Sequence, residues 1–365
     1  MTRLFRYVFL QSLIGVLGAA AVILAVIVLV DFVETSRDIA TRAEISPFQA
    51  LELTLLKSPL LVQETLPFIV LFGVLFTFFR LSRRSELIVM RASGVSAWRI
   101  LAPAALLAIA LGVFSAGALN PLGATANARF EALRDELMQG RTGAPRGEAG
   151  EIWLRETRPQ GFVIITAASV DADAARLMAP IFREYVRNET GAPRLERRVS
   201  ADSATLRGGF WVMENAVEVE PGGRTEALGE VAEPTDTRRQ ALFERVRTPG
   251  ATSFWALPGV IASAQAAGLS SRPYELRLHG LMAQPLMLLA AGLLAVAATF
   301  RMHRQGGAAA FAAIGALAGF VLYFVQELLL GLGASGALDP VTAAWSAPAL
   351  FALSGLLFVS ATEDG

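Results

Sequence analysis

The chain has 365 residues, of which 54% are apolar and only 18% are charged, and its 32 basic residues balance its 32 acidic ones. Soluble domains usually carry about a quarter charged residues, so this composition excludes an ordinary cytosolic enzyme. A net charge near zero also argues against a protein that binds nucleic acid through a bulk positive field. Charged residues gather in the middle of the chain, which indicates a membrane protein with an inserted water-soluble domain.

Six stretches are apolar and long enough to cross a bilayer, for which a helix needs about 20 residues. Three precede the polar middle and three follow it: residues 8–30, 59–79, 100–119, 279–300, 307–330 and 341–359. The first is too long for the apolar part of a signal peptide and is not followed by a small-residue cleavage pattern. We therefore predict an α-helical membrane protein with six transmembrane helices.

The arginines predict the orientation of these helices, because cytoplasmic loops carry an excess of basic residues. With the N-terminus inside, nine arginines fall on the cytoplasmic face: Arg3, Arg6, Arg80, Arg83, Arg84, Arg91, Arg99, Arg301 and Arg304. The short outside loops carry far fewer basic residues. Both termini are therefore expected in the cytoplasm and residues 120–278 outside.

The outside segment is expected to be mostly β-structure. Short alternating runs separated by turn residues occur at 150–156, 161–170, 177–186, 195–206 and 210–220, which predicts an antiparallel sandwich or jelly-roll. Residues 221–240 have little apolar content and are expected to form a mobile loop. Residues 123–139 are expected to extend the third transmembrane helix, and residues 254–267 to form an interfacial helix.

These elements define three regions. Residues 1–119 hold transmembrane helices 1–3, with a cytoplasmic coupling helix at about 84–94. Residues 120–278 form the periplasmic β-rich, jelly-roll-like domain with its connecting helices, and residues 279–365 hold transmembrane helices 4–6.

Signatures of catalysis are missing from the sequence. The chain has no cysteine, no GxxxxGK[ST] phosphate loop, no HExxH and no GxSxG. Its two histidines, His279 and His303, are expected on opposite sides of the membrane. Glu64 and Glu327 lie near the outer ends of their helices, whereas a proton relay would place carboxylates at mid-depth. No catalytic residue, metal site or cofactor is predicted.

The loop RLSRRSELIVMRASGVSAWR, residues 80–99, carries the clearest functional signal. Ser85 is expected to cap a short helix, Glu86 to lie in its positive first turn, and Gly94 to end it. An amphipathic helix of this kind, parallel to the membrane, can present a binding surface to a cytoplasmic motor protein. The alternative is an interfacial helix that only anchors the loop through its arginines.

The segment SELIVMRASG, the third span and the long β-rich insertion before three further spans resemble the lipopolysaccharide export permease family, LptF/LptG. The basic start RLFRYV, the stretch FVETSRD and the C-terminal LDPVTAAWSAPALF belong to the same pattern, so the resemblance covers essentially the whole chain. The C-terminal part looks most like the LptG half.

This resemblance implies an ABC transporter subunit that extracts lipopolysaccharide from the inner membrane, with ATP hydrolysis in a partner chain. The implied partners are a homologous LptF-like permease half, a cytoplasmic LptB-like ATPase dimer and a bitopic LptC-like protein that begins a periplasmic bridge. By the family's motif, Glu86 would meet the ATPase, with Arg91 and Gly94 on the same element.

The resemblance also implies basic residues near the outer end of the first span, where phosphates of lipid A would lie. Here the stretch is VLVDFVETSRD, in which Arg37 matches while Asp31 and Asp38 stand where a base is expected. Arg42 and Lys57 are further lipid-binding candidates. The alternative is a solvated turn in which Asp31, Glu34 and Arg37 pair at (i, i+3) spacing.

Gly315 and Gly319 form a GxxxG motif in the fifth span, which permits close helix approach. In a two-half permease, spans one and five would form a lateral gate against the partner; packing within the chain is the alternative. Two other functions stay open. One is a membrane-anchored structural protein that tethers a periplasmic binding domain, and the other, disfavoured by the absent catalytic motifs, is an intramembrane enzyme.

Overall fold

The fold is described by a computed structural model. It describes residues 2–40, 46–139, 152–158, 161–171, 174–187, 193–219, 225–237, 251–266, 270–301 and 308–363. The chain forms two compact units. A helical unit comprises Met1–Met138, Gly250–Pro258 and Arg272–Gly365, and a β unit comprises Gln139–Pro249 and Gly259–Ser271.

The helices of the described chain follow the expected order. They are α1 (Thr2–Ala40), α2 (Pro47–Arg83), α3 (Glu86–Ala92), α4 (Ala97–Phe114), the π-helix η1 (Ser115–Leu119), α5 (Asn120–Gln139), α7 (Leu257–Ala266), α8 (Arg272–Arg301), α9 (Ala308–Ser335) and α10 (Pro340–Glu363). The extension predicted over 123–139 is present as α5.

Six helical segments within the described residues are long and apolar enough to cross a membrane. They are Arg3–Arg37, Pro47–Arg83, Ala97–Arg134, Arg272–Thr299, Ala313–Ser335 and Pro340–Ala361. Three precede the β unit in the sequence and three follow it, which confirms the predicted fold class.

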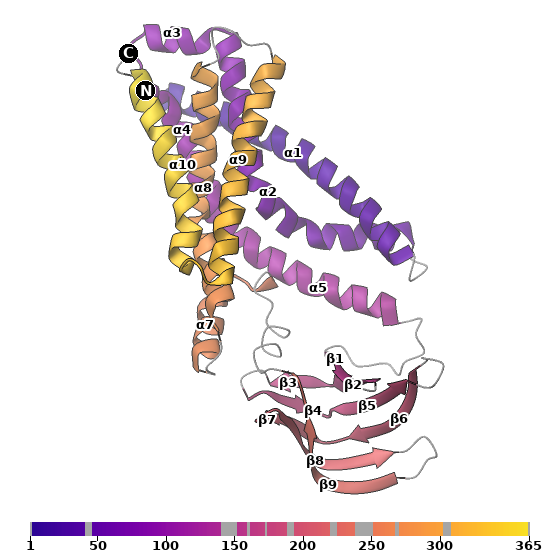
Figure 1. The fold of residues 1–365 in the computed structure, drawn as a ribbon. Coiled ribbons are helices and arrows are strands. Elements are labelled where there is room, and N and C mark those ends of the chain that lie inside the picture. Colours follow the sequence, from indigo (N-terminus) through magenta and orange to yellow (C-terminus); the bar gives the residue numbers. More distant parts are fainter. Residues whose placement is uncertain are drawn as a thin grey trace. The chain divides into compact units, whose positions relative to one another are not determined.

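Within the helical unit, α8 packs against α2, α4, α9 and α10. The two halves of the unit, separated by the β unit in sequence, therefore share one core. A second close contact joins α1 to α2. A Cβ atom added at Gly15 would lie 2.5 Å from the carbonyl oxygen of Gly73, so only glycine lets these two backbones meet. Beyond this crossing, Figure 1 shows α1 and the first half of α2 running side by side away from α8, α9 and α10.

The β unit contains one antiparallel sheet of nine described strands. They are β1 (Ile152–Arg158), β2 (Gly161–Ala167), β3 (Ser169–Asp171), β4 (Arg176–Met178), β5 (Ile181–Arg187), β6 (Pro193–Ser200), β7 (Ser203–Arg207), β8 (Phe210–Val219) and β9 (Thr225–Pro234). The strand order is β1-β2-β5-β6-β8-β7-β4-β3, and β9 pairs with β8. β1 and β9 are therefore far apart along the ladder of strands.

Side chains nevertheless join these distant strands, so the sheet curls into a nearly closed barrel. Glu156 on β1 accepts hydrogen bonds from the Trp211 indole on β8 (3.2 Å) and from the Thr237 hydroxyl after β9 (2.5 Å). Arg197 on β6 pairs with Glu184 on β5 and Glu233 on β9. Burial works to lower the pKa of Arg197, but hydrogen bonds and charge from both carboxylates outweigh it and raise that pKa above its usual value. The guanidinium therefore stays charged.

Three predictions about the β unit need correction. Residues 221–240 are not simply a loop, because β9 occupies Thr225–Pro234 and is mostly exposed. An edge strand bonded to β8 through its backbone needs few apolar side chains, so composition misled the prediction. The runs 161–170, 177–186 and 195–206 each divide into two strands; the second breaks at Ala179, which has a positive φ of 48°, and Pro180. In addition, the helix expected from residue 254 begins only at Leu257.

Candidate functional site

The short helix α3 lies between α2 and α4, where the coupling segment was expected. Figure 1 shows it at the end of the helical unit where α1 begins and α10 ends. Leu87 is buried against the helical core, whereas Ile88 and Val89 are 51% and 67% exposed. An exposed apolar surface on a polar loop is typical of a site that contacts another protein or the membrane.

Of the two predictions for the ends of α3, the one for its C-terminal end is confirmed and the one for its N-terminal cap is wrong. Gly94 adopts a positive φ of 80° just beyond the helix, as expected of a terminating glycine. Ser85 occupies the N-cap position but its φ of 60° is left-handed and its side chain makes no capping hydrogen bond, so the predicted cap is wrong. The chain turns at Arg84 and Ser85, between the end of α2 and the start of α3. Arg91 lies in the last turn and is exposed.

Glu86 is held by a residue that sequence reasoning missed. The Tyr7 hydroxyl on α1 donates a hydrogen bond of 2.6 Å to the Glu86 Oε2 atom. The same part of α1 also bonds α2, since the Thr77 hydroxyl donates to the Gln11 carbonyl (3.1 Å) and Arg80 donates to the Gln11 side chain. Tyr7 and Glu86 are 79 residues apart, and the only signal for Tyr7 was its place in the basic start RLFRYV.

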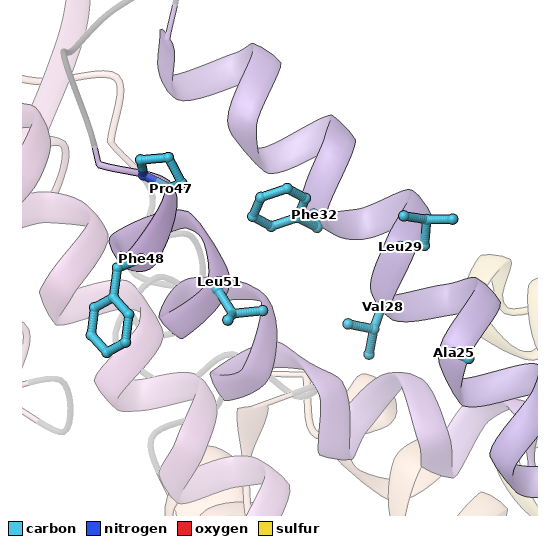
Figure 2. A pocket seen from close by; sticks show the side chains of 7 residues that line it. All are labelled: Ala25, Val28, Leu29, Phe32, Pro47, Phe48 and Leu51. Carbon is cyan, nitrogen blue, oxygen red and sulfur yellow. The ribbon is translucent and has the colours of Figure 1, made fainter.

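At their other ends, α1 and α2 flank an open apolar pocket of about 570 Å³. Its lining consists of Ala25, Val28, Leu29, Phe32, Pro47, Phe48 and Leu51. Figure 2 shows Val28 and Phe32 directed from α1 toward α2, with Leu51 directed back from α2. Among the described residues that line it, none is charged, so the pocket suits a hydrocarbon chain rather than a polar ligand.

The predicted lipid-binding bases are not equivalent in the structure. Lys57 donates to the Asp31 Oδ1 atom at 2.7 Å, and this ion pair ties α2 to α1 next to the pocket. Asp31 therefore pairs across helices, and among the described residues no ion pair links it to Arg37. Arg37 is exposed near the end of α1, and Arg42 lies outside the described residues.

Gly315 and Gly319 are both buried against α2 within the same chain. A Cβ atom added at Gly315 would lie 2.3 Å from Leu75 Cδ2, and one added at Gly319 would lie 3.2 Å from Phe68 Cδ1. The motif thus seats α9 on α2. The other side of α9 exposes large apolar residues, including Leu317, Phe320 and Phe324.

Six apolar helices and an inserted antiparallel β unit define a multi-pass membrane protein with a folded polar domain between its two helical halves. The family model for the lipopolysaccharide export system permease LptF/LptG matches residues 6–360. The chain belongs to this family of transport permeases. A search of curated proteins finds no match.

Proposed function

We propose that this chain is one permease half of an ABC exporter that extracts lipopolysaccharide from the bacterial inner membrane and passes it to a periplasmic bridge. The observation that carries the proposal is α3, a helix with two exposed apolar residues beside Glu86 at the end of the unit shared by both termini. Family membership supports the substrate. The arginine distribution supports cytoplasmic termini, a periplasmic segment 120–278 and membrane helices in 1–119 and 279–365.

In this proposal Glu86 receives the motion of a separate LptB-like ATPase dimer. A carboxylate at the start of a helix lies in the positive field of the helix end and accepts charge-assisted hydrogen bonds from a partner's basic groups. Ile88 and Val89 supply the apolar part of the contact, and Arg91 lies at its far edge. The Tyr7 bond then carries a displacement of α3 into α1.

Lipid would enter at the opposite end of α1. The apolar pocket between α1 and α2 offers an environment for acyl chains, and Arg37 supplies an exposed cation for a lipid phosphate. Arg42 is a further candidate. Lys57 is a weaker one in this state, because Asp31 already neutralises it.

The homologous LptF-like half would cover the apolar helices that this chain leaves open. In the most apolar windows of α1 and α9, only 11% and 17% of the residues are buried, against 50–56% in α2, α4 and α8. We propose that α1 and α9 form the lateral gate against that partner. Assignment of this chain to the LptG half and contact with an LptC-like bridge protein belong to the same proposal.

The test is purification of the tagged chain with its partners and reconstitution into vesicles that contain lipopolysaccharide. Glu86→Ala should abolish ATP-driven release of lipopolysaccharide while the chain stays folded, because Glu86 is only half-buried and its loss removes a single hydrogen bond near the surface. Arg37→Glu should reduce photocrosslinking of lipopolysaccharide near the end of α1. A chain that purifies alone and whose loss leaves surface lipopolysaccharide normal would instead be a tethering protein.

A further inference from the structure

A buried cluster of amide side chains lies where α2, α8 and the α4–η1–α5 helix meet. We call Gln63, Asn120 and Gln284 the polar node. Gln63 is 3% exposed and Asn120 is fully buried. The Asn120 amide donates to Gln63 Oε1 (3.3 Å), and Gln63 Nε2 donates to Gln284 Oε1 (3.3 Å).

Two prolines leave backbone carbonyls near the node without their helical donors. Pro67 has no N–H, so the carbonyl of Gln63, four residues earlier in α2, loses its helical donor; Gln284 Nε2 donates to it at 3.3 Å. Pro121 likewise frees the carbonyl of Gly117 in η1, and the Trp255 indole donates to it at 3.0 Å. Unpaired backbone groups are costly in a membrane, so each freed carbonyl recruits a side chain from another part of the chain.

The node also holds the segment through which the chain returns from the β unit. The backbone N–H of Phe254 donates to Asn120 Oδ1 at 2.7 Å, the shortest bond of the node. Asn120 begins α5, the helix that leads toward the β unit, and residues 251–256 belong to the return. A single buried side chain therefore ties the outgoing helix to the incoming segment, and both to α2.

We propose that Asn120 is a positioning residue that transmits displacement of α2 to the return segment 251–256. α2 is continuous from the node to the turn before α3, about 30 Å at 1.5 Å per residue. Motion received at α3 therefore reaches the node through one continuous helix, in which the bond from Gln284 to the Gln63 carbonyl replaces the one lost at Pro67. Satisfied amide networks in apolar surroundings specify one geometry. Such a network therefore suits a connection that must keep α2 and the return segment in a fixed relation. This inference rests on the proposed transport function.

The test compares Asn120→Leu with Asn127→Leu in the reconstituted complex. Asn127 lies on the same helix, and its amide donates to Glu131 one turn away. Asn120→Leu should lower lipopolysaccharide release about tenfold while ATP hydrolysis stays within about twofold of the parent chain, because losing a buried hydrogen bond displaces the segment but leaves α3 intact. Asn127→Leu should change neither. Wild-type release by Asn120→Leu would overturn the inference.

A second variant separates positioning from folding. The chain has no cysteine, so Asn120→Cys/Phe254→Cys offers one possible intramolecular disulfide. The oxidised protein should release lipopolysaccharide, and the reduced form of the same sample should not, with ATP hydrolysis equal in both. Equal release in both forms, or release only after reduction, would contradict a fixed connection. If the parent complex itself releases no lipopolysaccharide, the proposed function fails and not the connection.

Discussion

The hydrogen bond from the Tyr7 hydroxyl to the Glu86 carboxylate joins α1 to α3. Tyr7→Phe removes the donor and leaves the ring. We expect it to reduce ATP-driven lipopolysaccharide release severalfold, since an exposed hydrogen bond contributes about 0.5–1.5 kcal/mol. Steady-state ATP hydrolysis and release, measured on the same vesicles, check this.

The control for this prediction uses the partner residue. In a Glu86→Ala chain the bond is already lost, so adding Tyr7→Phe should change neither stability nor hydrolysis further. An additional loss in the double variant would show that Tyr7 acts through another group.

The ion pair between Lys57 and Asp31 gives a second prediction at the level of single residues. Lys57→Met leaves a carboxylate of 8% exposure without its cation. Because Lys57 itself is 37% exposed, we expect a loss of only about 1–2 kcal/mol, below that for fully buried pairs. Thermal unfolding in detergent measures it, and Lys57→Met/Asp31→Asn should recover most of the loss. A single variant as stable as the parent chain would show that solvent already screens the pair.

The places of some single residues could be predicted from the sequence, and those of others could not. Glu86 and Gly94 stood in a local motif, so a short helix that begins at Glu86 and ends before Gly94 was foreseeable. Tyr7 and the Asp31–Lys57 pair depend on how α1 and α2 cross, and no local pattern specifies that crossing. The sequence shows that Pro67 and Pro121 lack the N–H that a helical residue donates. Which donors take over depends on the packing of α8 and of residues 251–256, which no local pattern specifies.

At the level of elements, the crossing of α1 and α2 predicts a sharp difference between two glycines of α1. A Cβ atom at Gly15 would lie 2.1 Å from Thr77 Oγ1 and 2.5 Å from a backbone oxygen, whereas nothing lies within 4 Å of one at Gly18. Gly15→Val should destabilise the chain by about 1–3 kcal/mol by forcing the helices apart. Gly18→Val should stay within about 0.5 kcal/mol. Denaturation of both variants in the same detergent measures the two free energies of unfolding. Equal stability of the two variants would contradict the close backbone contact at Gly15.

The helices were easier to predict than the strands. Long apolar runs have few alternatives to a membrane helix, so all six membrane-spanning helices were predicted from composition. β9 was missed because the backbone of an edge strand bonds without apolar side chains. The chain breaks that divide three predicted runs into β2–β3, β4–β5 and β6–β7 occur at short irregular positions such as Ala179, for which the sequence carries only weak turn signals.

At the scale of the whole molecule, the exposed sides of α1 and α9 predict where the proposed second permease half would bind. In the cysteine-free chain, Val22→Cys and Leu317→Cys lie at positions 66% and 62% exposed, and Val296→Cys on α8 is fully buried. The first two should crosslink to cysteines introduced in the partner half, and the third should not. Crosslinking yield on denaturing gels measures this, and labelling of both exposed sites by lipid-soluble maleimide without any crosslink would place them against lipid.

The polar node also has a consequence for biosynthesis. Gln63 and Asn120 enter the membrane with the second and third spans, but Gln284 arrives with the fourth, after the whole β unit has been made. The Asn120 acceptor lacks its donor until Phe254 has been made, and the Gln63 carbonyl lacks its donor until Gln284 follows in the fourth span. The half-made chain therefore carries unpaired polar groups within its membrane helices, and these groups become hydrogen-bonded when the fourth span is complete.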